Sequence, residues 1–428
     1  MSVSLNSRII KRSARIALIG LGYVGLPLAV SFAQKGFKVL GIDTNEARID
    51  RIRNLKSYIA DVTNHEIGQV INQGHFSVST DFSLLSKADV IIICVPTPLK
   101  RKYTPDVSFI LSAIKSVAKY LKRDSLVILE STTYPGTTEE VIKPELEKSG
   151  MIAGHDFYVA FSPERIDPGN KEFKVTSMPK VVGGLTPKCT QLAALVYRQI
   201  TKHVHVVSST KAAEMTKLLE NSFRIVNIGW INEIAQACHK MNIDVWEVIR
   251  AANTKPFGFM AFYPGLGVGG HCIPEDPLYL YWKAKRYGFN SKFIKLAADV
   301  NANMPAYVVG RLVELIKNPS RAKLLILGVT YKKNVKDLRK SPPLKLIELL
   351  QRWGGVDYYD PFVPYLKIGA IDMESVILNA ATIRKYDCVV IAVDHAQVNY
   401  ELARKNARFI FDVKNIYSNI QDKKIVRL

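Results

Sequence analysis

Residues 15–43, RIALIGLGYVGLPLAVSFAQKGFKVLGID, decide the fold of this chain. The segment opens with an apolar run over residues 15–20 that is typical of a buried strand. A helical pattern over residues 24–34 follows and ends near Gly36, and a second strand is expected over residues 38–43. A strand, a glycine-rich turn, a helix and another strand in this order predict a doubly wound parallel sheet.

The turn carries Gly20, Gly22 and Gly25 in the pattern G-x-G-x-x-G, which is a weak signal when it stands alone. Here it follows a strand, opens a helix and precedes Asp43 at the end of the next strand, as dinucleotide binding requires. Gly20 permits the tight turn, Gly22 lets the backbone approach a pyrophosphate, and Gly25 allows the helix to pack on the sheet. Asp43 should accept hydrogen bonds from a ribose, which favours NAD over NADP. Another nucleoside ligand, such as S-adenosylmethionine, is the alternative.

Three further loops follow expected buried strands and should line the same edge of the sheet. They comprise residues 95–98 (VPTP), 130–133 (ESTT) and 162–165 (SPER). Any one of them can be an ordinary turn. Their common placement at strand ends favours a binding site.

The chain changes character after this region. Residues 211–240 predict one long helix, because their apolar residues recur at helical spacing and no proline interrupts them. More helices are expected to about residue 303, around a Gly/Pro-rich loop at residues 256–277. Strands and helices alternate again after residue 319, where LLILGVTYKKN loosely echoes the opening stretch.

We therefore predict an α/β protein with two Rossmann-like doubly wound domains, joined by a helical central domain with one long connecting helix. The expected domains are residues 1–208, 209–305 and 306–428. A length of 428 residues agrees with two or three domains.

Composition excludes several classes of protein. About half of the residues are apolar and about a quarter are charged, which disfavours disorder. No apolar run approaches the roughly 20 residues that span a bilayer. The first fifteen residues lack the apolar core of a secretory signal, so we expect a cytoplasmic protein. The five cysteines are far apart and form no C-x-x-C pair, so we expect neither a disulfide framework nor a metal site.

The formal charge of +21 agrees with nucleic-acid binding or with an anionic substrate and cofactor. Lysine and arginine are scattered along the chain, and no aromatic-basic motif accompanies them. We favour the anionic small molecules and expect neither nucleic-acid nor membrane partners.

Cys272 differs from the other cysteines because it lies in the loop GVGGHCIPEDP, residues 267–277. The glycines there should remove side-chain bulk, so that a substrate carbon can approach the sulfur. A lone cysteine is commonly a buried structural thiol. A glycine-rich loop is a poor place for one, which favours a nucleophile.

Several motifs in series resemble the UDP-glucose/GDP-mannose dehydrogenase family over about residues 15–415. They are GLGYVGLP (20–27), VPTP (95–98), STTYPGTT (131–138), SPERIDPGN (162–170), KLLEN (217–221), GVGGHCIPEDP (267–277) and GVTYKKNVKDLRKSP (328–342). Residues 253–272 look most like bacterial UDP-N-acetylglucosamine 6-dehydrogenases. UDP-glucose, UDP-N-acetylgalactosamine and UDP-N-acetylmannosamine stay open as substrates.

The resemblance implies a four-electron, NAD-dependent oxidation of the C6 alcohol of a UDP-sugar to a carboxylate. The sulfur of Cys272 would trap the aldehyde as a thiohemiacetal, which becomes a thioester and is hydrolysed. Lys217 and Asn221 would stabilise the oxyanions. Asp276 would position or activate water with the help of Thr132, and Glu164 would be a general base if burial raises its pKa toward neutrality.

The resemblance also assigns binding residues and an oligomeric state. The cofactor residues are Gly20, Gly22, Tyr23, Val24, Gly25, Asp43, Arg48, Thr97, Thr132 and Arg339. The substrate residues are Glu164, Arg165, Lys217, Asn221, Tyr263, Gly267, Tyr331 and Lys332. The family usually forms dimers on the long helix, so we expect a homodimer or a higher homo-oligomer. Lys414 takes the place of an arginine in many members and lacks its planar fork, which puts a contact there in doubt.

Two other functions compete with this interpretation. A hydroxyacid-type dehydrogenase would share the first domain and the long helix, but it would transfer two electrons and need no cysteine. A basic nucleotide-binding module would show no catalysis. The number of NADH molecules formed per sugar separates all three.

Overall fold

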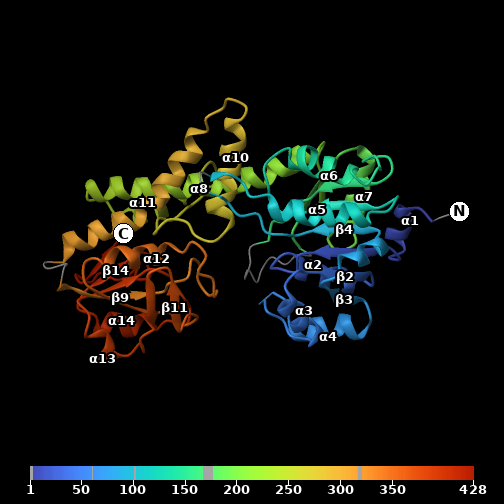
Figure 1. Ribbon diagram of the computed structural model, residues 1–428. Coiled ribbons are helices and arrows are strands. Elements are labelled where there is room, and N and C mark those ends of the chain that lie inside the picture. Colours follow the sequence, from blue (N-terminus) through green and yellow to red (C-terminus); the bar gives the residue numbers. More distant parts are fainter. Residues whose placement is uncertain (1–2, 60, 101–102, 167–176, 317–320) are drawn as a thin grey trace. The chain divides into compact units, whose positions relative to one another are not determined.

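The computed structural model describes residues 3–59, 61–100, 103–166, 177–316 and 321–428 (Figure 1). It forms two compact units. Unit 1 comprises Met1–Glu220 and Trp282–Gly288, and unit 2 comprises Asn221–Tyr281 and Phe289–Leu428. The long helix α8 (Thr210–Lys240) and helix α10 (Cys272–Lys285) contribute residues to both units.

Within the described residues, unit 1 contains one eight-stranded sheet in the order β3-β2-β1-β4-β5-β6-β7-β8. The strands from β3 to β6 are parallel, whereas β7 runs antiparallel to β6 and parallel to β8. Strands β4 and β5 are buried at every position, as expected for a parallel sheet covered on both faces. The strands are β1 (Arg15–Ile19), β2 (Lys38–Ile42), β3 (Phe76–Ser79), β4 (Val90–Ile93), β5 (Leu126–Leu129), β6 (Tyr158–Phe161), β7 (Lys180–Gly184) and β8 (Val204–Val206).

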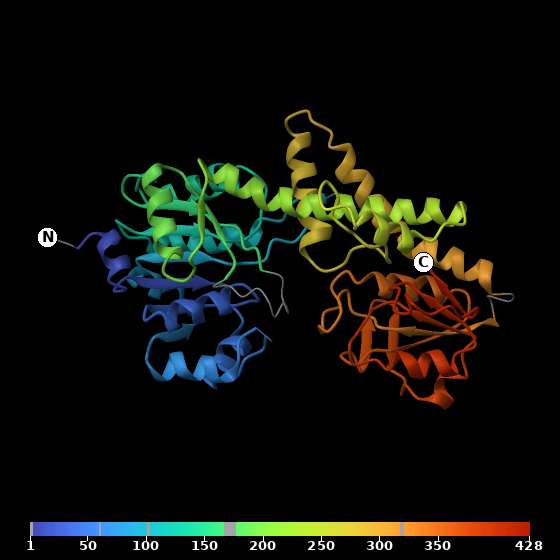
Figure 2. The same cartoon turned by 180° about the vertical axis from the view of Figure 1, so that it is seen from behind.

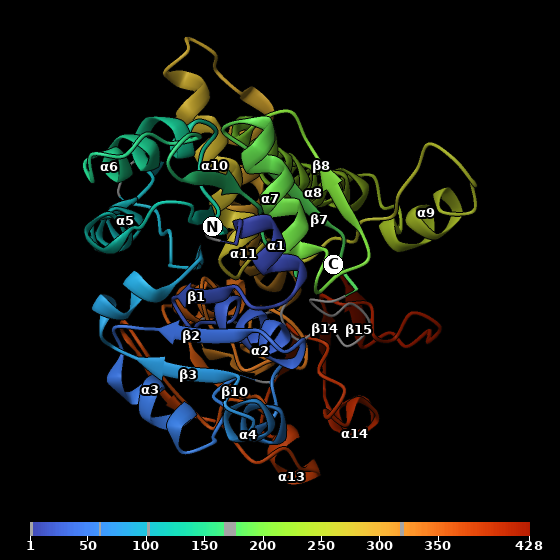
Figure 3. The same ribbon diagram turned by 90° about the vertical axis from the view of Figure 1, so that its right-hand side faces the viewer.

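Helices cover both faces of this sheet, as Figure 3 shows. One apolar cluster joins the sheet to α1, α2, α4 and α7, and a second cluster on the opposite face joins it to α5 and α6. The helices of unit 1 are α1 (Leu5–Ile10), α2 (Gly25–Gln34), α3 (Glu46–Arg53), α4 (Asn64–Asn72), the 3-10 helix η1 (Phe82–Lys87), α5 (Ser108–Tyr120), the π-helical turn η3 (Thr138–Ile142), α6 (Lys143–Glu147) and α7 (Pro187–Tyr197).

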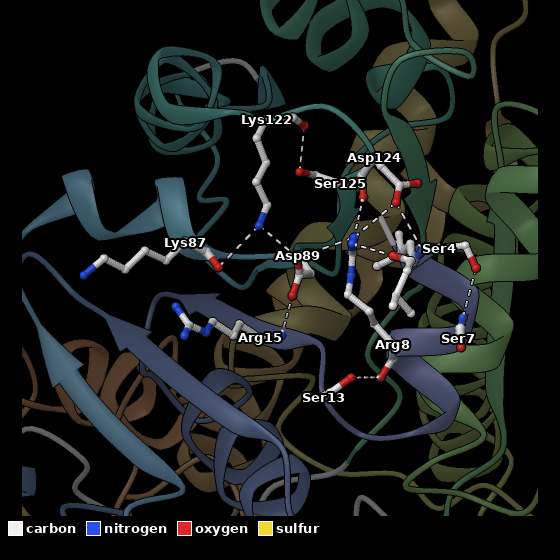
Figure 4. Close-up of polar contacts among 12 residues, drawn as sticks. Ser4, Ser7, Arg8, Ser13, Arg15, Lys87, Asp89, Lys122, Asp124 and Ser125 are labelled. Atoms are coloured by element: carbon white, nitrogen blue, oxygen red, sulfur yellow. Dashed lines mark hydrogen bonds and ion pairs between the residues drawn. The ribbon is translucent and has the colours of Figure 1, made fainter. Parts of the chain in front are cut away.

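The short helix α1 is anchored to the edge of the sheet where the parallel strands begin (Figure 4). The guanidinium of Arg8 lies 3.1 Å from Asp124 and 3.5 Å from Asp89. Asp89 also accepts a hydrogen bond from the Arg15 backbone N–H at 2.8 Å and lies 2.8 Å from the Lys122 ammonium. The basic start of the chain is therefore part of the folded unit 1.

Unit 2 contains a five-stranded parallel sheet in the order β10-β9-β13-β14-β15, counted over the described part of the chain. A separate antiparallel pair, β11-β12, lies between β10 and β13 in the sequence. The strands are β9 (Lys323–Leu327), β10 (Gly355–Tyr359), β11 (Tyr365–Ile368), β12 (Ile371–Glu374), β13 (Cys388–Ile391), β14 (Ile410–Asp412) and β15 (Ile425–Arg427).

Apolar clusters lie on both faces of this second sheet, with α11 and α12 on one face and α13 and α14 on the other (Figure 2). The remainder of α8, helix α9 and the start of α10 complete unit 2. The helices not yet located are α9 (Val245–Ala252), α11 (Lys292–Leu315), α12 (Pro342–Leu350), α13 (Ala380–Ile383) and α14 (Tyr400–Asn406).

The predicted architecture is confirmed: two parallel α/β sheets and a helical region that contains one 31-residue helix. The division into three domains, after residues 208 and 305, stays a prediction. The predicted loop at residues 256–277 is too long, because α10 begins at Cys272. No helix among the described residues is long and apolar enough to cross a membrane.

Candidate active site

The glycine-rich turn between β1 and α2 has the geometry expected of a pyrophosphate site. Gly20 has a φ of +90°, and a Cβ atom there would lie 2.6 Å from the Cys94 carbonyl oxygen. A Cβ atom at Gly25 would lie 1.9 Å from the Gly20 carbonyl oxygen. At Gly22, in contrast, no atom lies within 4 Å of such a Cβ. Gly20 and Gly25 are therefore required for packing, whereas Gly22 faces open space that a ligand can enter.

Asp43 follows β2 and is buried beside this turn. Its Oδ2 atom accepts hydrogen bonds from the Leu21 N–H at 2.8 Å and from Arg48 at 3.2 Å. The Arg48 side chain is 44% exposed and lies over the ring of Tyr58, whose hydroxyl donates to the Leu21 carbonyl. One carboxylate thus fixes the turn and lies beside a partly exposed arginine at the end of β2, which is the place of the acidic ribose-binding residue in dinucleotide-binding sheets.

Other predicted residues of unit 1 lie on loops at the same edge of the sheet. Thr97 is buried after β4, and Thr132 is half-buried after β5. Val24 is the N-cap of α2, and Tyr23 is 48% exposed beside it. Parallel strands bring these loops to one edge, so the structure groups them as the sequence predicted.

A buried cluster of charges lies at the ends of β5 and β6 and the start of β7. The ammonium of Lys180 lies 3.0 Å from Glu130 Oε1 and 2.8 Å from Glu164 Oε2. The Tyr197 hydroxyl also donates to Glu130. Burial raises the pKa of Glu130 to about 7, and the negative charge of Glu164 adds to that rise against the attraction of Lys180. One cation cannot balance two buried carboxylates, so Glu130 is the one whose pKa rises.

The pKa of Glu164 shifts in the direction opposite to the one that a general base needs. Burial acts to raise the pKa of its carboxyl, but Lys180 and the backbone N–H groups of Arg165 and Ile166 outweigh burial and lower the pKa. Those N–H groups donate to Glu164 at 2.6 and 2.7 Å. The condition for a general base, a pKa raised toward neutrality, is therefore not met at Glu164, because three donors stabilise its charged form.

The end of unit 1 holds two more predicted substrate residues. Arg165 pairs with Glu220 of helix α8 at 2.6 Å. Lys217 is only 7% exposed on the same helix, so it is not the usual solvated lysine. Part of the motif at residues 162–170, namely residues 167–170, falls outside the described residues.

Cys272 is exposed and is the first residue of α10 in unit 2. The N-terminus of a helix stabilises nearby negative charge, such as that of a thiolate. Asp276 follows one helical turn later on the same face and is 1% exposed. Its Oδ2 atom accepts a hydrogen bond of 2.6 Å from the Asn221 side chain. The structure thus brings Asn221 and Asp276 together beside the first turn of α10.

The sequence suggested that the glycines before Cys272 open space for a substrate, but other side chains and backbone atoms occupy that space. A Cβ atom at Gly267 would lie 2.3 Å from the Asn301 carbonyl oxygen. Atoms added at Gly269 and Gly270 would lie 2.6 and 2.8 Å from the Tyr331 side chain. The missing side chains make room for other parts of unit 2.

Tyr331 and Lys332 are half-buried and follow β9, on the edge where parallel strands end. Arg339 bonds to Asp337 through Nη2 at 2.6 Å and through Nε at 3.0 Å. Tyr263 is 55% exposed and stacks on Trp246 with ring centroids 6.1 Å apart. Burial lowers the pKa of Lys414, whose ammonium lies near Gly265.

Comparison with known proteins shows to which family this chain belongs. Residues 14–201, 211–303 and 325–419 match, respectively, the NAD binding domain, the central domain and the UDP binding domain of one family. A UDP-N-acetyl-D-glucosamine 6-dehydrogenase of Pseudomonas aeruginosa is 37% identical over 97% of this chain and 100% of its own length. The chain belongs to the UDP-glucose/GDP-mannose dehydrogenase family.

Two solved structures of the family agree with the fold. A UDP-D-ManNAc dehydrogenase from Pyrococcus horikoshii has a TM-score of 0.88 at 36% identity, over 96% of this chain and 98% of its own. An NDP-N-acetyl-D-galactosaminuronic acid dehydrogenase from Methanosarcina mazei Go1 has a TM-score of 0.82 at 30% identity, over 100% and 98%. The protein is therefore an NAD-dependent UDP-sugar dehydrogenase family enzyme, and the predictions of its family and cofactor are confirmed.

Sequence reasoning placed Glu130 in a loop of the site without predicting its buried charge cluster, and it did not find Lys180, Asp360 or His395. All four residues belong to buried polar clusters at strand ends of the two sheets. The one available signal was their place next to buried strands, since charged residues there need partners. Their partners lie 16 to 50 residues away for Lys180 and 35 residues away for His395.

Proposed function

We propose that this protein oxidises the C6 alcohol of a UDP-N-acetylhexosamine, and of UDP-N-acetylglucosamine foremost, to the uronic acid. The observation that carries the proposal is an exposed cysteine that begins a helix, with a buried carboxylate one turn later and an amide bonded to that carboxylate. A hydroxyacid dehydrogenase needs no such thiol. Converting CH2OH to a carboxylate removes four electrons, so the enzyme must hold the aldehyde between two oxidations.

The residues of the first turn fit NAD, because Gly22 is open and the Asp43 carboxylate lies at the end of β2. We assign Gly20, Gly22, Tyr23, Val24, Gly25, Asp43, Arg48, Thr97, Thr132 and Arg339 to it. When bound there, NAD would supply the hydride acceptor, and one NAD molecule would be needed for each of the two oxidations. Asp43 would repel the 2′-phosphate of NADP.

Cys272 is the proposed nucleophile. Its sulfur adds to the aldehyde carbon and forms a thiohemiacetal, which the second oxidation converts to a thioester. The covalent bond keeps the reactive aldehyde on the enzyme. Water then breaks the carbon–sulfur bond, releasing the carboxylate and restoring the thiol.

The charged and polar groups have separate proposed roles. Lys217 and Asn221 stabilise the oxyanion that forms on the sugar carbon. Asp276 orients water for thioester hydrolysis, with Thr132 holding the same water. Glu164 acts as an ionised carboxylate toward the sugar or the water, because its lowered pKa leaves it without a proton to donate at neutral pH.

The UDP half is assigned to Tyr331, Lys332, Tyr263 and Gly267, and Arg165 joins Glu164 on the sugar side. Lys332 supplies a positive charge after β9, at the edge where ligands bind in parallel sheets. The match of residues 325–419 to a UDP binding domain supports the assignment of Tyr331 and Lys332.

The choice of sugar rests on the relatives. The Pseudomonas aeruginosa relative named for UDP-N-acetylglucosamine matches over its full length. The likeness to the Pyrococcus horikoshii structure named for the mannosamine epimer makes UDP-N-acetylmannosamine the second candidate. Both carry an N-acetyl group at C2 and differ only in its configuration.

A panel of UDP-sugars tests the proposal through NADH absorbance. We expect the highest kcat/KM with UDP-N-acetylglucosamine and two NADH per sugar, with UDP-N-acetylmannosamine, UDP-N-acetylgalactosamine and UDP-glucose lower. Cys272→Ala should abolish uronic acid formation, whereas Cys238→Ala, at a buried cysteine, should retain it. One NADH per sugar, or normal acid formation by Cys272→Ala, would refute the covalent mechanism.

We also propose a homodimer built on α8, and three domains divided after residues 208 and 305. Leu219, Phe223 and Trp230 of α8 are 60%, 46% and 54% exposed, which is unusual for large apolar side chains on one helix. Sedimentation equilibrium should give twice the chain mass of 47.9 kDa, and Trp230→Glu should shift it toward the monomer.

A further inference from the structure

The two sheets repeat one structural element, a glycine and an aspartate at the ends of adjacent strands. In unit 1, Asp43 Oδ2 accepts the Leu21 N–H at 2.8 Å, and Gly20 has a φ of +90°. In unit 2, Asp360 Oδ2 accepts the Val329 N–H at 2.8 Å, and Gly328 has a φ of +88°. The second sheet thus retains the aspartate of a dinucleotide site.

The two aspartates differ in what faces them. Asp43 meets Arg48, whose side chain is 44% exposed. Asp360 meets His395 at 3.1 Å, and the side chains of both residues are 0% exposed. The carboxylate of unit 2 is therefore occupied inside the protein, where no ribose can reach it.

The hydrogen bonds assign the proton on His395. Its Nδ1 atom accepts the backbone N–H of Asn334 at 3.0 Å, so the proton of the neutral ring is on Nε2. Nε2 lies 3.1 Å from Asp360 Oδ2 and 3.1 Å from the Thr330 hydroxyl, which itself donates to the Lys332 carbonyl at 2.9 Å. Both ring nitrogens thus connect to the segment at residues 330–334.

Two further contacts join this segment to the residues that flank His395. The Asn334 side chain accepts the Ala396 N–H at 2.9 Å, and Lys333 lies 3.3 Å from Asp394. Asn334 has a φ of +60°, a conformation that asparagine tolerates better than most residues. The segment is fixed from both sides of the imidazole.

We propose that His395 is a positioning residue for the nucleotide half of the substrate. His395 holds residues 330–334 so that Tyr331 and Lys332 meet the UDP group. This proposal rests on the proposed function of those two residues. Tyr331 also fills the space left by Gly269 and Gly270 before Cys272. The imidazole therefore sets the position of the segment at residues 330–334, which is called the UDP segment below.

Two substitutions separate the nitrogen atoms of the ring. His395→Asn retains an acceptor near the place of Nδ1 for the Asn334 N–H, and His395→Gln retains a donor near the place of Nε2 for Asp360. We expect the KM for the UDP-sugar to rise about 10-fold or more in His395→Gln, as for loss of a buried hydrogen bond, and less in His395→Asn. The kcat at saturation and the KM for NAD should stay within about 2-fold.

Tyr386→Phe is the matched control, because Tyr386 donates to Asp357 at 2.7 Å in the same sheet but does not contact the UDP segment. It should lower the melting temperature without changing the KM for the UDP-sugar. If the His395 variants do not fold, Asn334→Gly decides the question, because glycine suits the φ of this exposed residue while losing the bond to Ala396. Its KM for the UDP-sugar should rise about 3-fold or more.

The outcomes distinguish this inference from the proposed function. Lys332→Ala should raise the KM for the UDP-sugar in the full-length enzyme. If it does so while neither His395 variant nor Asn334→Gly does, the positioning role is refuted and the proposed function stands. Positioning is also refuted if the His395 variants and Tyr386→Phe alike lower kcat and raise both KM values, because such a change reports a general structural defect. If the wild-type enzyme oxidises no UDP-sugar, both proposals fall together.

Discussion

Replacing Glu130 with glutamine should abolish the part of the loss of stability that accompanies ionisation of Glu130 as the pH rises through about 7. In the folded protein, Glu130 shares the cation of Lys180 with Glu164, and all three side chains are buried. Glutamine retains an oxygen that can accept from Lys180 and Tyr197. Its amide nitrogen takes the place of Oε2, a buried atom that has no hydrogen-bond partner among the described residues. The substitution thus mimics the protonated carboxyl and cannot ionise.

The sign and size of the effect follow from the pKa values. Folding raises the pKa of Glu130 from 4.5 to about 7, mainly through burial, so the folded state binds the proton more tightly than the unfolded chain does. The resulting stability is complete below pH 4.5 and is lost as the pH rises through about 7. From about pH 5.5 to about pH 8.5 the loss is about 2 kcal/mol. Glu164, whose pKa is lowered, loses its contribution only below about pH 4.5 and does not affect this window.

Thermal unfolding followed by circular dichroism at both pH values measures this difference. For a unit of this size, about 2 kcal/mol corresponds to a melting temperature lower by about 4–8 °C at the higher pH. Glu130→Gln should remove that part of the decrease, whereas Glu348→Gln, at an exposed ion pair, should retain it. Parallel profiles for the wild type and Glu130→Gln would show that Glu130 is ionised throughout, and the reasoning would be wrong.

Three further predictions rest on local geometry. Gly22→Ala should raise the KM for NAD about 10-fold with little change in melting temperature, whereas Gly25→Ala should lower the melting temperature, because only Gly25 lacks space for a Cβ atom; equal melting temperatures would contradict this. Asp276→Asn should lower kcat by about 10²-fold or more, as measured by NADH formation, because an amide cannot activate water; an unchanged kcat would remove Asp276 from the mechanism. Arg8→Ala should lower the melting temperature by about 2–8 °C through loss of its partly buried hydrogen bonds to Asp124, and the exposed Arg53→Ala should not; equal effects would show that α1 is not anchored by Arg8.

The parallel strands were the most predictable elements. Residues 90–93 are apolar and wholly buried, so their sequence has one interpretation. Strand β7 was not predicted, because it begins with Lys180 and ends with two glycines. The helical segment at residues 138–147 opens as a π-helical turn, since Pro144 cannot donate the bond to residue 140 that an α-helix needs. Pro274 lies in the first turn of α10, where the backbone needs no N–H donor. A proline there is therefore compatible with a helix, but in the sequence it indicated a loop and concealed where the helix begins.

The site was predictable where its residues are local in sequence. Gly20, Gly25 and Asp43 act through a single strand–turn–helix unit, and their spacing therefore carries the information. Lys180 acts through carboxylates on two other strands, and no local pattern records that contact. The glycines before Cys272 show the same limit: the need for them is visible, but the Tyr331 side chain that occupies the space is 61 positions from Gly270 in the chain.

The contact of Tyr331 with Gly269 and Gly270 has an evolutionary consequence. A mutation that enlarges either glycine displaces the aromatic ring, and a mutation that enlarges the ring displaces the glycines. Tyr331 can therefore change in the course of evolution only within the room that the neighbouring peptide leaves. Compensating pairs of changes, rather than single ones, are the path by which this contact can be remodelled.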